Sequence, residues 1–210
     1  MSESRRRALV VGINTYENSK ISSLSQCVND AESIKNMLEM KEYGFDAKIK
    51  TDKNATRREI KKGLNWLFDS QTDFALFYFA GHGIVNDLGT HIVTFDGDEI
   101  DFGIELSTID LYLRKRMRGD ANAVVILDCC HSGGMPLKRG KRDFTRSIAS
   151  EDIRSEISQM RNGHAVLAAC GPNEGAAELP SLDTMVSSHI TSYRHSMGML
   201  RMSRALLPLA

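Results

Sequence analysis

Apolar residues fall along the chain in short runs and in helical spacings, and the two kinds of pattern alternate. Short β-type runs predict five strands, over residues 7–13, 45–50, 73–80, 121–127 and 163–169. Spacings of three and four predict helices over residues 25–40 and 106–117, and another after a cap at residues 54–56. A hairpin arm is expected over residues 91–95, a loop over 138–145, and a helix or partly ordered segment over 149–160.

Strands that alternate with helices predict an α/β fold, in which a mostly parallel sheet carries helices on both faces. Functional groups of such sheets gather beyond the carboxyl ends of the strands. The strand at 73–80 leads into Gly81, His82 and Gly83, and the strand at 121–127 leads into Asp128, Cys129 and Cys130. If these two strands are neighbours, His82 and Cys130 lie close together at one edge of the sheet.

Composition and charge narrow the class of protein. The chain has 210 residues, of which 41% are hydrophobic and 26% charged, and these values are typical of one globular domain. Lys plus Arg and Asp plus Glu both number 27, so net charge does not indicate a nucleic-acid or membrane partner. The basic runs at residues 5–7 and 138–142 are interpreted as solvated segments. No apolar run reaches the roughly 20 residues of a membrane helix. Without a signal-peptide pattern, a cytoplasmic location with free thiols is expected.

Cys130 and His82 are the candidate catalytic pair. A cysteine nucleophile needs a thiolate, a base to take its proton, and donors for the oxyanion. Glycines follow Cys130 at positions 133 and 134, and glycines flank His82, so a substrate backbone can approach both. The backbone amides of Gly83 and Cys130 are the candidate oxyanion donors, each of them worth about 3 kcal/mol of transition-state stabilisation.

Other interpretations of these residues remain open from the pattern alone. A cysteine after a strand is often a buried apolar residue, and a histidine between glycines can be a turn residue. Cys129 is an alternative nucleophile, although strand alternation directs it away from Cys130, and His131 is a rival base. A metal site of Cys129, Cys130, His131 and His82 has no usual zinc spacing, so no metal is expected there.

Two segments resemble the catalytic blocks of the caspase-like peptidases, most closely metacaspases and their prokaryotic relatives. They are FYFAGHG at residues 77–83 and ILDCCHSGG at residues 126–134, and their separation agrees with the caspase spacing of about 50 residues. The resemblance extends to the segments RALVVGINTY and LSQCVNDA, and to residues 163–178. It implies a caspase-like three-layer α/β sandwich and a cysteine endopeptidase that needs no cofactor, with Cys130 as nucleophile and His82 as base.

The resemblance also implies a substrate preference. In metacaspases two aspartates line the pocket for a basic residue, and the matching positions here are Asp30 and Asp128. Asp128 precedes Cys130 by two residues, so in an extended strand both project to the same side. Two carboxylates favour Arg or Lys at the cleavage position, which makes basic peptides and proteins the expected partners. The plainer alternatives are a helix-surface charge for Asp30 and a strand-end carboxylate for Asp128.

An acidic cluster offers a possible calcium site. Asp96, Asp98, Glu99 and Asp101 supply hard oxygen ligands of the kind that calcium takes. Several metacaspases bind calcium, but their paired aspartates before Glu-Leu are replaced here by Gly103 and Ile104. A solvated acidic loop is therefore favoured over a calcium site.

The last residues depart from the family pattern. Residues 1–180 are predicted to form the peptidase domain, and residues 181–210 an atypical tail where relatives continue with Gly-x-Phe-Thr, a helix and a strand. A two-nucleotide shift in frame from Asp183 can be made to encode that missing segment, so the tail is interpreted as a frameshift product. Loss of the last helix and strand would expose a sheet edge and weaken or abolish activity. A weak or inactive module with a binding or regulatory role is the alternative function.

Overall fold

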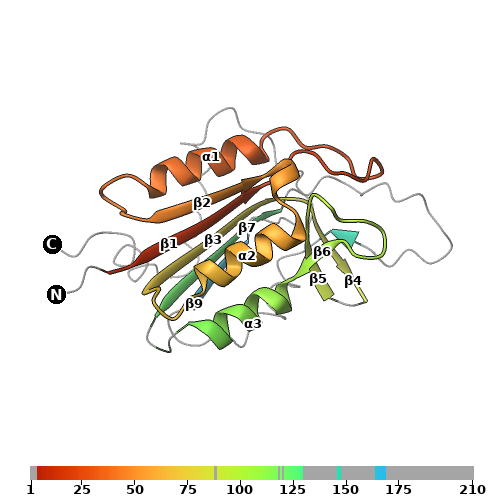
Figure 1. The fold of residues 1–210 in the computed structure, drawn as a ribbon. Helices are drawn as coiled ribbons and strands as arrows, with labels where there is room; N and C mark the ends of the chain where they lie inside the picture. The colour runs from red at the N-terminus through yellow and green to blue at the C-terminus, as the bar shows by residue number, and fades with distance from the viewer. Residues whose placement is uncertain are drawn as a thin grey trace, which may run out of the picture.

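A five-stranded parallel sheet forms the centre of the protein (Figure 1). The structure is a computed structural model that describes residues 4–87, 89–117, 119, 121–129, 146–147 and 164–168. The strand order is β2-β1-β3-β7-β9, and every pairing in this sheet is parallel. The strands are β1 (Arg6–Gly12), β2 (Asp46–Thr51), β3 (Phe74–Gly81), β7 (Asn122–Cys129) and β9 (His164–Ala168). These five strands are the five that the apolar runs predict.

Helices cover both faces of this sheet, as the alternation of elements predicts (Figure 1). The helices are α1 (Cys27–Leu38), α2 (Arg57–Leu67) and α3 (Leu106–Arg116). Strand side chains alternate between two cores because successive residues of a strand point to opposite faces. Leu76 and Tyr78 of β3 share a core with α1, whereas Phe77 and Phe79 share a core with α2 and α3. The result is the predicted three-layer sandwich.

The start of α2 shows how local sequence sets an element boundary. The Thr56 side chain accepts a hydrogen bond from the Glu59 backbone N–H at 3.3 Å, which is the N-cap geometry that the sequence predicts. The short 3-10 helix η1 (Asp52–Asn54) precedes it and was not predicted. The cap fixes the position of Arg57, the first residue of α2 and an anchor for the loop described below.

A second, antiparallel sheet begins where β3 ends. Its strand order is β6-β5-β4-β8, formed by β6 (Gly103–Glu105), β5 (Gly89–Val93), β4 (Gly83–Asn86) and β8 (Arg146–Ser147). The expected hairpin arm at residues 91–95 overlaps β5, whereas β4 and β6 were not predicted. Only His82 separates β3 from β4, so this residue joins the two sheets.

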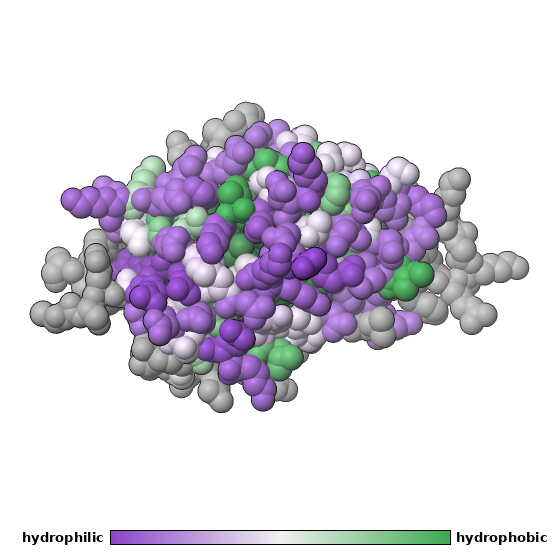
Figure 2. Space-filling model, in the orientation of Figure 1, coloured by the Kyte–Doolittle hydropathy of each residue, from purple (hydrophilic) through white to green (hydrophobic). Residues whose placement is uncertain are grey.

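The surface is mostly hydrophilic in the view of Figure 2, where hydrophobic side chains are scattered. Met40, Ile100 and Leu111 are the exposed large hydrophobic residues among those described. No helix in the described part of the chain is long and apolar enough to cross a membrane. The loop expected at residues 138–145, the helix at 149–160 and the tail at 181–210 lie outside the described residues, so the missing last helix and strand stay a prediction.

Candidate active site

The register between β3 and β7 brings the two candidate catalytic segments together. The strands pair in parallel, and Gly81 and Cys129 are Cα partners at their carboxyl ends. The condition for bringing His82 and Cys130 to one edge, that these strands are neighbours, is therefore met. His82 follows Gly81 directly, and Cys130 is the next residue in the sequence after Cys129. Cys130, with Gly134, His131 and the rest of residues 130–145, lies outside the described residues.

The His82 side chain is buried and hydrogen-bonded through Nε2. The residue is 3% exposed, and Nε2 lies 2.8 Å from the Ser22 carbonyl oxygen and 3.3 Å from Ser22 Oγ. A carbonyl oxygen only accepts, so the hydrogen of the neutral ring resides on Nε2 in this bond. The lone pair is then on Nδ1, and that nitrogen is the one able to take a proton.

The backbone of His82 is held on two further sides. Its N–H donates to the Tyr16 hydroxyl at 2.9 Å, and its carbonyl accepts from the Val93 N–H at 2.9 Å. The Tyr16 and His82 rings are tilted by 32° with their centroids 5.2 Å apart. The imidazole is therefore fixed by the loop after β1 and by the small sheet together.

Burial lowers the pKa of His82 from its ordinary value of 6.5 because it disfavours the charged imidazolium. The hydrogen bond to the Ser22 carbonyl acts in the opposite direction and raises this pKa, but burial is the larger effect. The ring is consequently neutral at pH 7, which is the state that a general base requires.

The loop at residues 13–26 carries Tyr16 and Ser22 and is fixed by two polar side chains. Asp52 Oδ1 accepts from the backbone N–H groups of Asn14 and Thr15, at 2.8 and 3.0 Å. The Asn14 side chain donates to the Ser25 carbonyl at 3.2 Å, and the Asn14 carbonyl accepts from Leu24 at 2.8 Å. Sequence reasoning gave no role to these residues, although Asn14 and Tyr16 belong to the resembling segment RALVVGINTY.

The amide of Gly83 points away from β5. Residues of an antiparallel pair alternate between hydrogen-bonded and non-bonded positions. His82 and Val93 form a bonded position, so the next pair, Gly83 with Ile92, is a non-bonded one. The Gly83 N–H therefore faces the edge of β4 on which β8 pairs with Ile84 and Val85, and it is predicted to be an oxyanion donor. That role stays a prediction.

Cys129 has the environment of a core residue. It is 3% exposed and belongs to the core between the sheet and α2 and α3. Asp128 precedes it and is half-buried, on the side of β7 where Val124 and Ile126 pack against the α1 core. Burial of this kind hinders a thiol from meeting a substrate, which weakens the alternative that Cys129 is the nucleophile.

The two predicted substrate-binding carboxylates lie near one phenol. The Tyr78 hydroxyl donates to Asp128 Oδ2 at 3.3 Å. Burial raises the pKa of Tyr78 well above 10, and the negative charges of Asp128 and then Asp30 raise it further. Asp30 comes from α1 and Asp128 from β7, so charges from two elements that are far apart in the sequence act on the same phenol. Their role in binding substrate stays a prediction.

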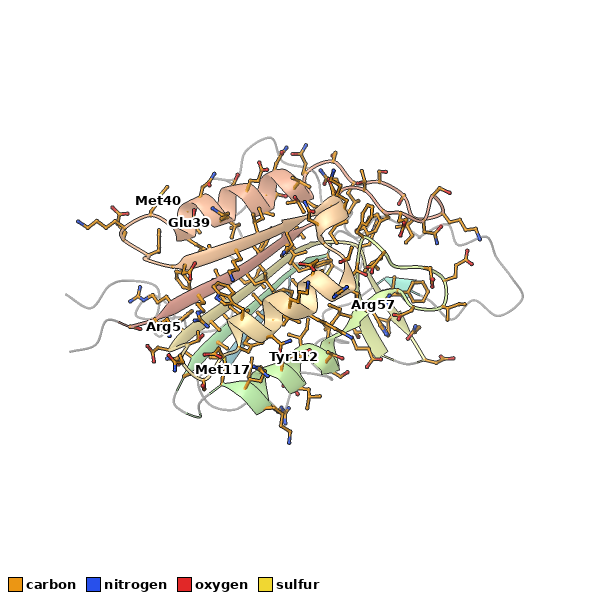
Figure 3. All side chains as sticks on the ribbon, in the orientation of Figure 1. Arg5, Glu39, Met40, Arg57, Tyr112 and Met117 are labelled. Carbon is orange, nitrogen blue, oxygen red and sulfur yellow. The ribbon has the colours of Figure 1, made fainter. Side chains whose placement is uncertain are left out.

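The acidic loop at residues 96–101 is held by contacts to Arg57 and Lys20 and by hydrogen bonds within the loop. Asp101 pairs with Arg57 at 2.6 Å, Glu99 pairs with Lys20, and Asp96 accepts from the Arg57 N–H at 2.8 Å. Arg57 extends from the start of α2 in Figure 3. Hydrogen bonds from the amides of Asp101 and Ile100 lower the pKa of Asp98. Among the described residues, no three acidic, histidine or cysteine side chains are grouped as a metal site.

Comparison with known proteins places this geometry in a family. Residues 5–196 match the model of a family described as the caspase domain, and the match runs past residue 180 into the segment predicted as a tail. Metacaspase-3 of Trypanosoma cruzi is 27% identical over 85% of this chain and 56% of its own. Metacaspase-1 of Eremothecium gossypii is 29% identical over 61% of this chain and 32% of its own length. Metacaspase-8 of Arabidopsis thaliana is 30% identical over 62% of this chain and 38% of its own length. The chain thus spans about a third to a half of these curated relatives.

The fold also resembles a solved structure. Protein GSU0716 from Geobacter sulfurreducens superposes with a TM-score of 0.52, over 62% of this chain and 52% of that protein. The two sequences are 22% identical, so this likeness concerns the fold alone. It agrees with the parallel sheet and the two helical layers described above.

Proposed function

The chain belongs to the caspase domain family, and on that premise we propose that it is a cysteine endopeptidase that cleaves peptide bonds after Arg or Lys. The observation that carries the proposal is the pairing of Gly81 with Cys129 at the tips of β3 and β7. A buried, neutral His82 follows the first of these residues, and Cys130 follows the second in the sequence.

The proposed reaction begins at His82 Nδ1, which takes the proton of the Cys130 thiol. The thiolate attacks the substrate carbonyl carbon, and the N–H groups of Gly83 and Cys130 stabilise the oxyanion. As the tetrahedral intermediate collapses, the imidazolium gives its proton to the leaving amine and a thioester remains on Cys130. Water then attacks the thioester with His82 as base, which releases the new carboxyl end and restores the thiol.

Charge supports the choice of basic substrates. The carboxylates of Asp128 and Asp30 both lie near Tyr78, and they come from elements that flank the β3 tip. Two negative charges attract an Arg or Lys side chain and repel an Asp side chain. We therefore assign the basic-residue preference to Asp30 and Asp128 together, and expect protein or peptide substrates.

Covalent labelling tests the proposal without requiring rapid turnover. The purified chain is treated with a chloromethyl ketone peptide that ends in Arg, and the alkylated cysteine is located by peptide mass spectrometry. We expect the label on Cys130, a much slower reaction in His82→Ala, and an unchanged reaction in the matched control Cys129→Ala. A peptide that ends in Asp should react more slowly than the Arg peptide.

Two results would contradict the proposal. Labelling of Cys27 or Cys129 instead of Cys130 would remove the assigned nucleophile. If no cysteine of the folded chain reacts with the Arg peptide, the alternative of a binding or regulatory module is favoured.

A further inference from the structure

We propose that Tyr78 is a positioning residue that orients the Asp128 carboxylate for the basic side chain of the substrate. The inference rests on the proposed function, because it concerns the same substrate-binding carboxylates. It assigns a task to a hydroxyl group that lies in the middle of an otherwise apolar strand, with the sequence FALFYFAG.

The strand register explains how the two residues meet. In the β3–β7 pair, Tyr78 is opposite Ile126 and Ala80 is opposite Asp128, so Tyr78 and Asp128 are diagonal neighbours on one face. Aromatic side chains can span this diagonal. The small side chain of Ala80 leaves the path along β3 open, and the Tyr78 hydroxyl reaches Asp128 Oδ2 at 3.3 Å.

The hydroxyl of Tyr78 is too deeply buried to be an incidental surface group. The residue is 5% exposed and belongs to the core that α1 covers. Phe74 lies on the same face of β3 and in the same core, which shows that phenylalanine fits this face of the strand. A buried hydroxyl costs roughly 1–3 kcal/mol unless it is hydrogen-bonded, so its favourable contribution must come from bonds such as the one to Asp128.

The electrostatic surroundings keep Tyr78 a donor. Burial and the charges of Asp128 and Asp30 hold the pKa of the phenol well above 10, so it is protonated at neutral pH. A protonated phenol donates to the Asp128 carboxylate and fixes one of its oxygens. Loss of the donor should therefore weaken recognition of a basic side chain and leave the reacting thiol and imidazole unchanged.

The test compares Tyr78→Phe with the matched control Tyr112→Phe, which alters a partly buried tyrosine of α3 in the opposite core. Two reagents are used on the full chain, the Arg chloromethyl ketone peptide and the small uncharged reagent iodoacetamide. In Tyr78→Phe we expect labelling of Cys130 by the Arg peptide to slow by roughly tenfold, the effect of one hydrogen bond to a charged group. Labelling by iodoacetamide should change less than twofold, and Tyr112→Phe should resemble the parent with both reagents.

A double-mutant cycle with Asp128→Asn keeps the inference testable if Tyr78→Phe also lowers stability. If Tyr78 acts through Asp128, its substitution should have little further effect on Arg-peptide labelling once Asp128 is neutral. Equal slowing with both reagents, or full additivity in the cycle, would show a merely structural role and overturn the inference. Failure of the parent to label at Cys130 would instead reject the proposed function itself, so the two failures are distinguishable.

Discussion

The imidazole Nε2 of His82 lies 2.8 Å from the backbone carbonyl oxygen of Ser22, a residue 60 positions earlier in the chain. This bond makes Nε2 the protonated nitrogen of the neutral ring and directs the basic Nδ1 elsewhere. It joins the loop after β1 to the point where the two sheets meet.

We predict that His82 titrates below pH 6.5, because burial disfavours its imidazolium more than the Ser22 carbonyl favours it. An NMR titration of the histidine ring protons in Cys130→Ala, with His82 assigned by comparison with the His82→Gln form of that variant, measures the midpoint. A midpoint above 6.5 would contradict the prediction.

The same shift predicts a pH dependence of stability. Between the lowered pKa and 6.5, the unfolded chain binds a proton at residue 82 and the folded chain does not. The contribution of His82 to stability is therefore present above the unfolded pKa and is lost as the pH falls through this window. In urea unfolding, His82→Gln should lack this part of the pH dependence, which has a slope of at most about 1.4 kcal/mol per pH unit. Parallel curves for parent and variant between pH 5 and 7 would refute it.

Tyr16→Phe should reduce both stability and reactivity. The change deprives the backbone N–H of the buried residue His82 of its 2.9 Å acceptor, and an unsatisfied buried donor costs about 1–3 kcal/mol. We expect a lower urea midpoint and slower labelling of Cys130 by both Arg peptide and iodoacetamide. Tyr43→Phe is the control, since that hydroxyl makes no hydrogen bond within the described residues. A Tyr16→Phe protein with the parent's midpoint and rates would show that this bond is dispensable.

The parallel sheet was predictable because its inner strands β1, β3 and β7 are largely apolar, β2 alternates between polar and apolar residues, and helical patterns lie between the strands. The residues around His82 illustrate what a pattern cannot predict. Ser22 contributes through a backbone carbonyl, which any residue type possesses, and Asp52 acts on the loop of Asn14 across the fold. The strand β6 has only three residues, too few for a period of two to stand out.

The predicted substrate-binding residues show what a family resemblance adds to the pattern of the sequence. Asp30 and Asp128 were paired only through a family resemblance, and their proximity to Tyr78 depends on how α1 packs on β3. The sequence pattern identifies Tyr78 only as one more residue of an apolar strand. Its hydroxyl acquires a partner only through the β3–β7 register, and nothing in the local sequence specifies that register.

Cys27 and Cys129 should react slowly with thiol reagents in the native protein. They are 2% and 3% exposed, and burial shields the sulfur from the reagent. With iodoacetamide, peptide mass spectrometry should show both residues modified far more slowly than Cys130. In concentrated urea the three rates should converge. Rapid native modification of Cys129 would revive it as a candidate nucleophile.

Calcium should leave the melting temperature unchanged. Asp101 and Asp96 are engaged by Arg57, and Glu99 by Lys20, so a cation at the acidic loop would have to displace these contacts. Thermal unfolding with millimolar calcium is compared with unfolding in excess EDTA. Arg57→Ala is the informative variant, because it removes the competing cation and should lower stability in both buffers. A calcium-dependent rise in the parent's melting temperature would establish a site that the sequence disfavours.

Gly12→Ala should destabilise the fold strongly because α1 begins against the end of β1. A Cβ on residue 12 would lie 2.3 Å from the Cys27 carbonyl oxygen and 2.7 Å from the Ala31 Cβ. The obstacle is mainly helix backbone, which cannot rotate away as a side chain can, so we expect a loss of at least about 2 kcal/mol. Gly119→Ala is the matched control, since nothing lies within 4 Å of the added carbon there. Urea midpoints compare the two variants.

The same substitution also tests whether α1 positions the substrate carboxylates. Displacement of α1 moves Asp30 relative to Tyr78 and Asp128, so Arg-peptide labelling of any folded Gly12→Ala protein should slow more than iodoacetamide labelling. If the Gly12→Ala midpoint equals that of Gly119→Ala, the close approach of helix and strand is not required for stability. If its two labelling rates keep the parent's ratio, the position of α1 does not determine the preference for basic peptides.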